Sequence, residues 1–231
     1  MAPSTDPPPP RRALLAGATG LVGRALLELL GQAPQYAQVH ALLRRPAPWP
    51  PDPRLTLHQV DFDHLPPLPA VDDVFIALGT TIKAAGSEAA FRRVDFDAVV
   101  NTARAARAAG AVRLMVVSAL GADAASRVFY NRVKGEMQQA VVALGYDTVV
   151  IAQPSLLLGD RSGLGQPARL GEALAQRVLA PVLPLLPAGV RPIRAEAVAR
   201  ALLKTALHAG PGITLLSSRE MQAIGRTGPR R

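Results

Sequence analysis

One tyrosine and one lysine stand at a spacing that suits proton transfer. Tyr130 and Lys134 are the two ends of the run Tyr-Asn-Arg-Val-Lys, and on a helix this spacing puts the phenol and the ammonium on one face, one turn apart. A free phenol has a pKa of about 10, and a nearby ammonium is expected to lower the pKa of Tyr130 because it favours the phenolate. The pair is thus predicted to act as a general acid or base. The alternative is a surface tyrosine on a basic helix.

A glycine-rich turn near the start of the chain suits the phosphates of a dinucleotide. Residues 17–23 read Gly-Ala-Thr-Gly-Leu-Val-Gly, after a short apolar run and before leucines at helical spacing. The first glycine allows a tight turn, the second leaves room for a pyrophosphate, and the third lets the helix pack close to the strand. The first N–H groups of that helix would then face the phosphates. The expected cofactor contacts here are Gly17, Thr19, Gly20, Leu21, Val22 and Gly23.

Basic residues after the second predicted strand favour NADP(H) over NAD(H). Arg44 and Arg45 directly follow the predicted strand at residues 39–43, at the place where a protein that binds NAD usually carries an acidic residue for the ribose 2′-hydroxyl. A guanidinium suits the 2′-phosphate of NADP instead. Arg24, directly after the third glycine, is expected to reach the same phosphate. The alternative is that Arg44 and Arg45 belong to a solvated loop.

The elements that would position these residues alternate between strands and helices. Strands are predicted at residues 13–16, 39–43, 55–60, 74–78, 112–117, 148–152 and 213–216, and helices at 21–30, 91–109, 127–144, 170–182 and 196–207. Short apolar strands that alternate with helices predict an α/β fold of the Rossmann type, with a doubly wound parallel sheet and helices on both faces. Ligands of such sheets bind outside the carboxyl ends of the strands.

Composition sets the expected domain boundaries. Residues 1–12 are rich in proline and are predicted to form a disordered arm, and residues 218–231 a disordered basic tail. Both ends are expected to be dispensable for folding. Residues 13–155 are predicted to form the NADP-binding domain, which a small substrate-side region at 156–217 completes. The apolar run 179–190 is broken by three prolines, which favours a packed lid or an oligomer contact over membrane contact.

Composition also excludes several classes of function. The chain has 231 residues, of which 49% are hydrophobic and 19% charged, so it is not a disordered chain. It has no cysteine, and its four histidines show no metal spacing, so no metal site is expected. The chain has no run of about 18 apolar residues and no secretory signal, which predicts a cytoplasmic protein without a membrane span. The net charge of +9 is scattered, so nucleic-acid binding is not expected.

The combined motifs resemble the short-chain dehydrogenase/reductase superfamily, whose extended and atypical members carry the same glycine spacing. Ser118 ends the fifth predicted strand, 12 residues before Tyr130. The resemblance implies that Tyr130 exchanges a proton with the substrate, that Lys134 also binds the nicotinamide ribose, and that Ser118 orients the substrate oxygen. It further implies cofactor contacts at later strand ends, with Asp61 beside the adenine and Ala77, Leu78, Gly79, Thr80 and Pro154 along the cofactor.

Further residues narrow the resemblance to the atypical group that includes the Tat-interacting-protein-like oxidoreductases. They fall in runs at 77–81, 83–87, 118–123, 134–136 and 157–161, and the likeness covers about residues 13–208. One difference is Gln153, where many extended members carry arginine before the proline, and this weakens the case for nucleotide-sugar substrates. The helices at 91–109 and 127–144 commonly pair across dimers in this superfamily, which favours a homodimer.

The leading hypothesis is an NADP(H)-dependent oxidoreductase that transfers a hydride between nicotinamide and a small carbonyl or alcohol, with Ser118, Tyr130 and Lys134 as the catalytic residues. Two alternatives stay open. One is an NADPH-binding regulatory protein with little turnover, and the other is a nucleotide-sugar epimerase-like enzyme. The latter needs a pocket for a second nucleotide, and the chain after Pro154 is short for it.

Overall fold

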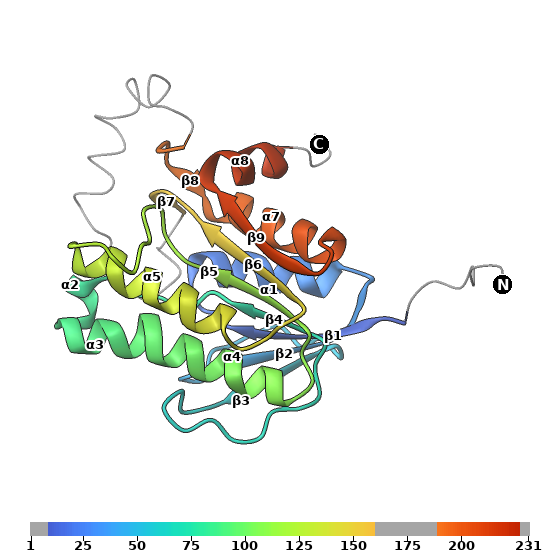
Figure 1. The fold of residues 1–231 in the computed structure, drawn as a ribbon. Coiled ribbons are helices and arrows are strands. Elements are labelled where there is room, and N and C mark those ends of the chain that lie inside the picture. Colours follow the sequence, from blue (N-terminus) through green and yellow to red (C-terminus); the bar gives the residue numbers. More distant parts are fainter. Residues whose placement is uncertain (1–8, 160–188, 227–231) are drawn as a thin grey trace.

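The computed structural model describes residues 9–159 and 189–226 of the chain (Figure 1). The predicted helix at 170–182 and nearly all of the apolar run 179–190 lie outside these residues. The same holds for most of the predicted arm and for the last residues of the predicted tail.

A seven-stranded parallel sheet forms the centre of the molecule. Its strands are β1 (Arg11–Ala16), β2 (Tyr36–Leu43), β3 (Leu55–Gln59), β4 (Asp73–Ile76), β5 (Arg113–Val117), β6 (Thr148–Gln153) and β9 (Gly212–Ser217). The order across the sheet is β3-β2-β1-β4-β5-β6-β9, and every neighbouring pair is parallel. The order reverses between β1 and β4, and this reversal is where a doubly wound sheet binds its ligand. The predicted fold class is confirmed.

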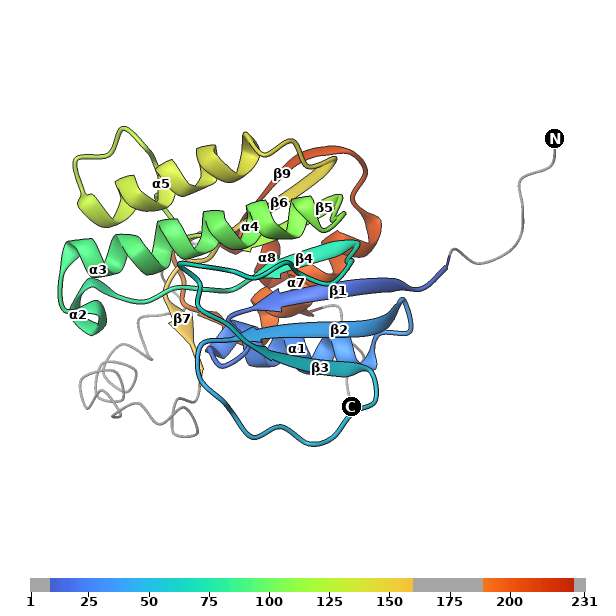
Figure 2. The same ribbon diagram turned by 90° about the horizontal axis from the view of Figure 1, so that it is seen from below.

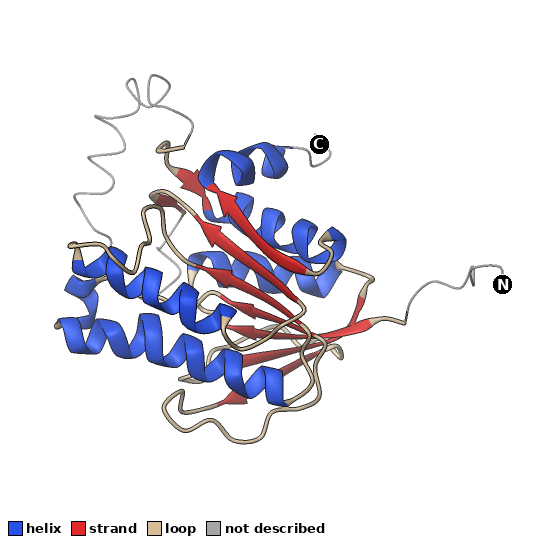
Figure 3. Ribbon diagram, in the orientation of Figure 1, coloured by secondary structure: helices blue, strands red, loops and turns tan. Residues whose placement is uncertain are grey.

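Helices cover both faces of the sheet (Figures 2 and 3). On one face lie α4 (Ala98–Ala108) and α5 (Phe129–Val142), and on the other α1 (Leu21–Gln32), α7 (Ala195–His208) and α8 (Ser218–Arg226). Successive residues of a strand point to opposite faces, so Leu14 and Leu15 of β1 belong to two separate apolar clusters. The core is therefore double-sided, as the nearly unbroken apolar strands indicate.

The helix predicted at 91–109 is continuous but changes type along its length. α3 (Glu88–Arg92) passes into a π-helical turn, η1 (Arg93–Asp97), which leads into α4. Phe91 and Asp95 are both fully buried. A π-helical turn changes the direction in which side chains leave a helix, and here it accompanies a carboxylate that points into the protein. A short preceding helix, α2 (Ile82–Ala85), is capped by Thr81.

Two short strands that the sequence patterns do not predict form a second, parallel sheet. They are β7 (Leu157–Leu158) and β8 (Ile193–Arg194). The N–H of Ile193 also donates to the carbonyl of Leu156 at 2.9 Å. This small sheet fixes the chain that leaves β6 next to the chain that enters α7.

The structure corrects both predicted chain ends. Arg11 and Arg12 are not part of an arm but begin β1, because their guanidinium groups pair with Asp73 at 3.3 Å and Asp72 at 3.2 Å. At the other end, residues 218–226 form α8 rather than a loose tail. Met221 of α8 is fully buried in the same apolar cluster as α7. Both misplaced boundaries depend on contacts with distant parts of the chain.

Candidate cofactor and active site

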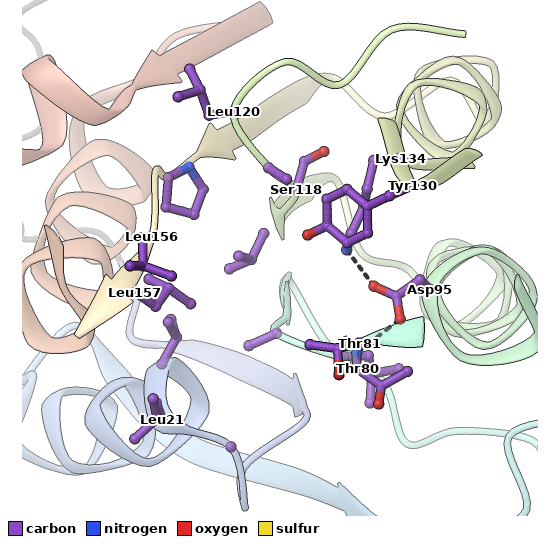
Figure 4. A pocket seen from close by; sticks show the side chains of 18 of the residues that line it. Leu21, Thr80, Thr81, Asp95, Ser118, Leu120, Tyr130, Lys134, Leu156 and Leu157 are labelled. Atoms are coloured by element: carbon purple, nitrogen blue, oxygen red, sulfur yellow. Dashed lines mark hydrogen bonds and ion pairs between the residues drawn. The ribbon is translucent and has the colours of Figure 1, made fainter. Parts of the chain in front are cut away.

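A pocket of about 510 Å³ lies at the carboxyl ends of the strands (Figure 4). It is lined by most of the predicted site residues, together with several that were not predicted. The predicted residues on its wall are Gly20, Leu21, Val22, Ala77, Leu78, Gly79, Thr80, Ser118, Tyr130, Lys134 and Pro154. The glycine turn after β1 and the tyrosine–lysine pair on α5 therefore face one space.

The glycine turn is packed as a dinucleotide cradle requires. Gly17 has φ +91°, and a Cβ there would lie 2.5 Å from the carbonyl oxygen of Ala77. A Cβ on Gly23 would lie 1.9 Å from the carbonyl oxygen of Gly17, so α1 packs directly on the turn. Gly20 differs, because the nearest atom to its Cβ position is 3.4 Å away and the residue lines the pocket. No side chain caps α1, so the positive end of the helix suits a pyrophosphate.

Small residues continue the cradle after β4. Ala77, Leu78 and Gly79 line the pocket, and a Cβ on Gly79 would lie 3.3 Å from a carboxylate oxygen of Asp95. The N–H of Thr80 donates to the other carboxylate oxygen of Asp95 at 2.8 Å. Asp95 thus fixes the strand end against which a cofactor ribose would lie.

Tyr130 and Lys134 lie on α5 and line the pocket from the side opposite α1 (Figure 4). The ring of Tyr130 packs on the buried ring of Phe91, with the centroids 5.3 Å apart. The Nζ atom of Lys134 is 2.7 Å from the carboxylate of Asp95, and the side chains are 4% and 1% exposed. A buried charge needs a paired partner, so the Lys134–Asp95 pair is a fixed part of this wall.

The pKa of Tyr130 is raised above that of a free phenol, which corrects the expectation of a lowered value. Burial of the ring is the largest cause, because it disfavours the phenolate. The Lys134 ammonium lowers the pKa of Tyr130 as expected, but the Asp95 carboxylate raises it. Neither the burial of the ring nor the charge of Asp95 follows from the spacing of Tyr130 and Lys134. Tyr130 is therefore a protonated phenol at neutral pH.

Ser118 follows β5 and is 5% exposed at the pocket wall. Its N–H donates to the carbonyl of Ala152 on β6 at 2.7 Å, which holds the backbone at the strand end. The hydroxyl oxygen accepts a hydrogen bond from Nε2 of Gln138 at 2.6 Å. Since Gln138 lies on α5, the Ser118 hydroxyl is turned toward that helix (Figure 4).

The remaining predicted residues do not line the pocket. They are Gly17, Thr19, Gly23, Arg24, Arg44, Arg45 and Asp61. Gly17 and Gly23 allow the close backbone packing of the turn without lining the pocket. Arg44 and Arg45 are exposed at the end of β2, whose Leu42 pairs with Ala16 just before the turn. Asp61 is exposed, and its carboxylate accepts from the N–H of Asp63 at 3.0 Å and lies 3.3 Å from Nδ1 of His64.

Sequence reasoning gave no role to several residues of the site. Asp95 and Gln138 hold Lys134 and Ser118, and Thr81, Leu120, Leu156 and Leu157 line the pocket. The sequence spacing could have indicated Gln138. It lies four residues after Lys134, so it continues the row of Tyr130 and Lys134 along α5. No periodic pattern in the sequence indicates Asp95, since its approach to Lys134 depends on the π-helical turn and on the packing of two helices.

The described residues contain neither a metal-binding cluster nor a helix that could cross a membrane. Among residues 9–159 and 189–226, no group of three or more His, Cys, Asp or Glu side chains could hold a metal ion. Within the same ranges, no helix has both the length and the apolar character to cross a membrane.

A doubly wound parallel sheet with a glycine cradle at its crossover point defines a dinucleotide-binding protein of the Rossmann type. Residues 17–157 match the family described as NAD(P)H-binding, and the chain belongs to that family.

Curated relatives agree with this assignment. The chain is 33% identical over 220 residues to Protein HTATIP2 of Rattus norvegicus, and the aligned region covers 92% of this chain and 88% of the relative. It is 38% identical over 151 residues to Protein FMP52, mitochondrial, of Eremothecium gossypii, covering 64% of this chain and 67% of the relative. The resemblance to the Tat-interacting-protein-like group is thereby confirmed.

Solved structures share the fold at low identity. MoeE5 in complex with UDP-glucose and NAD matches with a TM-score of 0.66 and 17% identity, over 93% of this chain and 80% of that one. A short chain dehydrogenase family protein from Francisella tularensis subsp. tularensis SCHU S4 matches with a TM-score of 0.62 and 14% identity, over 92% of this chain and 99% of that one. These similarities establish the α/β fold alone.

Proposed function

We propose that the protein is an NADP(H)-dependent oxidoreductase that reduces a small carbonyl compound to an alcohol. One observation carries this proposal. A protonated phenol, Tyr130, faces the same pocket as a cradle that fits a dinucleotide, with the buried Lys134–Asp95 pair beside it. Family membership supports NAD(P)H binding, and the chemistry is inferred from the residues.

The protonation state of Tyr130 favours the direction of reduction. Reduction of a carbonyl needs a proton donor for the oxygen, whereas oxidation of an alcohol needs a base. Because burial raises the pKa of Tyr130, the phenol keeps its proton at neutral pH. The residue is thus suited to donate.

Bound NADPH would supply the hydride that reaches the carbonyl carbon. Tyr130 donates its phenolic proton to the carbonyl oxygen, so that the product is a neutral alcohol and the residue becomes a phenolate. Lys134 stabilises that phenolate by its charge, and Asp95 holds the ammonium in place. Ser118 donates a hydrogen bond to the same substrate oxygen. The phenolate regains a proton from water before the next turnover.

The described wall on the substrate side is apolar. Leu120, Leu156 and Leu157 line it, and Leu120 and Leu156 are 42% and 67% exposed. Figure 4 shows Leu156 and Leu157 across the pocket from Tyr130 and Asp95. Such a wall suits a carbonyl compound with an aliphatic or aromatic substituent.

NADP(H) is proposed over NAD(H) because of charge at the end of β2. Arg44 and Arg45 are exposed there, beside the strand that leads into the glycine turn. A guanidinium pairs with a phosphate dianion, and the two residues leave no carboxylate for a ribose hydroxyl. Arg24 on α1 is proposed as a third contact to the 2′-phosphate.

Three earlier expectations remain predictions. They are a homodimer, a cytoplasmic location and the absence of nucleic acid among the partners. The FMP52 relatives are named as mitochondrial proteins.

Replacing Tyr130 with phenylalanine tests the proposed function. The variant loses the donated proton but keeps the ring on Phe91, so carbonyl reduction should fall by at least about 10²-fold. NADPH affinity should change by less than about 1 kcal/mol, because only the reacting hydroxyl is removed. The measurement is NADPH oxidation with a panel of aldehydes, ketones and quinones, beside a binding titration.

Tyr146→Phe is the matched control for this variant. Its hydroxyl donates to the carbonyl of Ala103 at 2.6 Å and the residue is 8% exposed, so reduction should stay within about twofold of wild type. A wild type that binds NADPH and reduces no carbonyl supports the regulatory protein instead. Equal reduction by wild type and Tyr130→Phe contradicts the assignment of the proton donor.

A further inference from the structure

The hydroxyl of Ser118 is held by the side chain of Gln138. Its hydroxyl oxygen accepts from Nε2 of Gln138 at 2.6 Å, a shorter distance than the 3.3 Å of the bond that Oε1 of Gln138 accepts from Gln153. Gln138 lies four residues after Lys134 and eight after Tyr130 on α5. One side of this helix thus carries the proton donor, its stabilising charge and the group that holds Ser118.

A second glutamine holds the first. Nε2 of Gln153, the last residue of β6, donates to Oε1 of Gln138 at 3.3 Å. Both ends of the Gln138 amide are therefore engaged, the carbonyl oxygen by Gln153 and the NH2 group by Ser118. The contact with Gln153 selects this orientation, since turning the Gln138 amide over would place its NH2 group against the NH2 group of Gln153.

That orientation decides what the Ser118 hydroxyl can still do. A hydroxyl has one proton to donate and two lone pairs to accept with. Since Gln138 presents its NH2 group, the Ser118 oxygen uses a lone pair and keeps its proton for another acceptor. If Gln138 presented its carbonyl oxygen instead, the Ser118 proton would be consumed by that bond. A substrate carbonyl oxygen can only accept a hydrogen bond. It therefore needs the arrangement in which Gln138 presents its NH2 group and Ser118 keeps its proton.

We propose that Gln138, oriented by Gln153, is a positioning residue that keeps the Ser118 proton free for the substrate oxygen. The inference rests on the proposed function, in which Ser118 donates to that oxygen. It assigns a role to the position before Pro154, where the neutral Gln153 donates to another neutral amide. Neither glutamine is a catalytic residue, since each acts through its neighbour.

Replacing Gln138 with glutamate tests the proposal at constant shape. A carboxylate only accepts, so Ser118 must donate to it and loses its proton for the substrate. We expect kcat for carbonyl reduction to fall by about 10²-fold, as for the loss of one donor to a developing oxyanion, with NADPH affinity within about threefold. Gln153→Glu should lower kcat in the same direction, because the new carboxylate attracts the Gln138 NH2 group and turns the amide over.

Gln139→Glu is the matched control, because it makes the same change at the exposed neighbour on α5. Its kcat should stay within about twofold of wild type. A double-mutant cycle then separates positioning from a general structural effect. In a Ser118→Ala background, Gln138→Glu should cause little further loss, because the group through which it acts is absent. If the fold losses in kcat of the two single variants multiply in the double variant, the proposal is overturned.

A second measurement does not depend on turnover. In the full-length protein labelled with ¹⁵N, the side-chain NH2 resonances of Gln138 are identified by their disappearance in Gln138→Glu. They should shift in Ser118→Ala and in Gln153→Glu, and stay in place in Gln139→Glu. If the Gln138 resonances do not shift in Ser118→Ala and in Gln153→Glu, the proposal is overturned. If the wild type reduces no carbonyl, the proposed function fails, and these resonances alone decide whether Gln138 positions Ser118.

Discussion

At the level of single residues, burial and two charges of opposite sign together set the pKa of Tyr130. Lys134 lowers the pKa of Tyr130 and Asp95 raises it, while burial adds the largest rise. The Asp95 carboxylate lies 2.7 Å from Nζ of Lys134 and acts on the phenol in the direction opposite to the ammonium. Asp95 therefore helps to keep the proton on Tyr130, which is the state that reduction requires.

Replacing Asp95 with asparagine should move the alkaline limb of carbonyl reduction to lower pH. Without the carboxylate, the pKa of Tyr130 falls, and activity is lost as pH rises through that pKa because the protonated phenol is the donor. The Asp95 carboxylate raises the pKa of Tyr130, so its removal is expected to move the limb to lower pH. The free energy of unfolding should also drop by about 3–5 kcal/mol, because Lys134 loses its buried partner. The measurements are kcat/KM against pH and urea unfolding.

Two variants separate the charge from the loss of packing. Asp95→Glu keeps the negative charge, so the limb should stay near its wild-type position. Asp97→Asn removes a carboxylate from the same π-helical turn and should leave the limb in place. An alkaline limb that does not move in Asp95→Asn, or that moves to higher pH, contradicts the role given to this carboxylate.

The contrast between these residues shows which part of the site sequence patterns can predict. Tyr130 and Lys134 are predictable because one helical turn brings them together, and Gln138 continues the same spacing. Asp95 precedes Lys134 by 39 residues and reaches it from another helix. The spacing of the tyrosine–lysine pair therefore predicts proton transfer, but the sign of the pKa shift depends on burial and on a contact that no local pattern contains.

At the level of elements, boundaries set by local signals are predictable and those set by distant partners are not. α1 begins at Leu21, directly after the second glycine of the turn, as predicted. β1 starts earlier than its apolar run because Arg11 pairs with Asp73, the first residue of β4, and Arg12 pairs with Asp72, the residue before it. α8 is stable only through packing, as is usual for a helix of 9 residues.

Met221→Ala should destabilise the whole fold, although it lies in the predicted tail. The side chain is fully buried in the cluster that α7 shares, so we expect the free energy of unfolding to fall by about 2–5 kcal/mol. Deleting α8 by ending the chain at Ser217 should cost at least as much, contrary to the expectation that this tail is dispensable. Urea unfolding measures both changes.

Arg219→Ala is the control for the Met221 prediction, because Arg219 is exposed on the same helix. Its free energy of unfolding should stay within about 0.5 kcal/mol of wild type. A Met221→Ala protein as stable as Arg219→Ala would show that α8 does not pack on the core in solution.

At the level of the whole molecule, the cofactor is expected to stabilise the fold, because its cradle exists only in the folded state. The glycine turn, the end of β4 and α5 meet only when the sheet is assembled. A ligand that binds only the folded state stabilises it by about 2.7 kcal/mol at a concentration of 100 times its Kd. For a protein of about this size, 1 kcal/mol corresponds to about 2–4 °C in Tm.

NADPH should therefore raise the Tm of the wild type by about 5–10 °C when present at 100 times its Kd. At the same concentration NADH should raise it much less, because it lacks the 2′-phosphate, and a charge-assisted hydrogen bond contributes about 1.5–3 kcal/mol. In Arg44→Glu the carboxylate repels that phosphate, so the two cofactors should give nearly equal shifts. Arg104→Glu reverses the same charge on an exposed part of α4 and should keep the preference for NADPH. Thermal unfolding with each cofactor measures all of these shifts, and equal shifts in the wild type contradict the assignment of NADP(H).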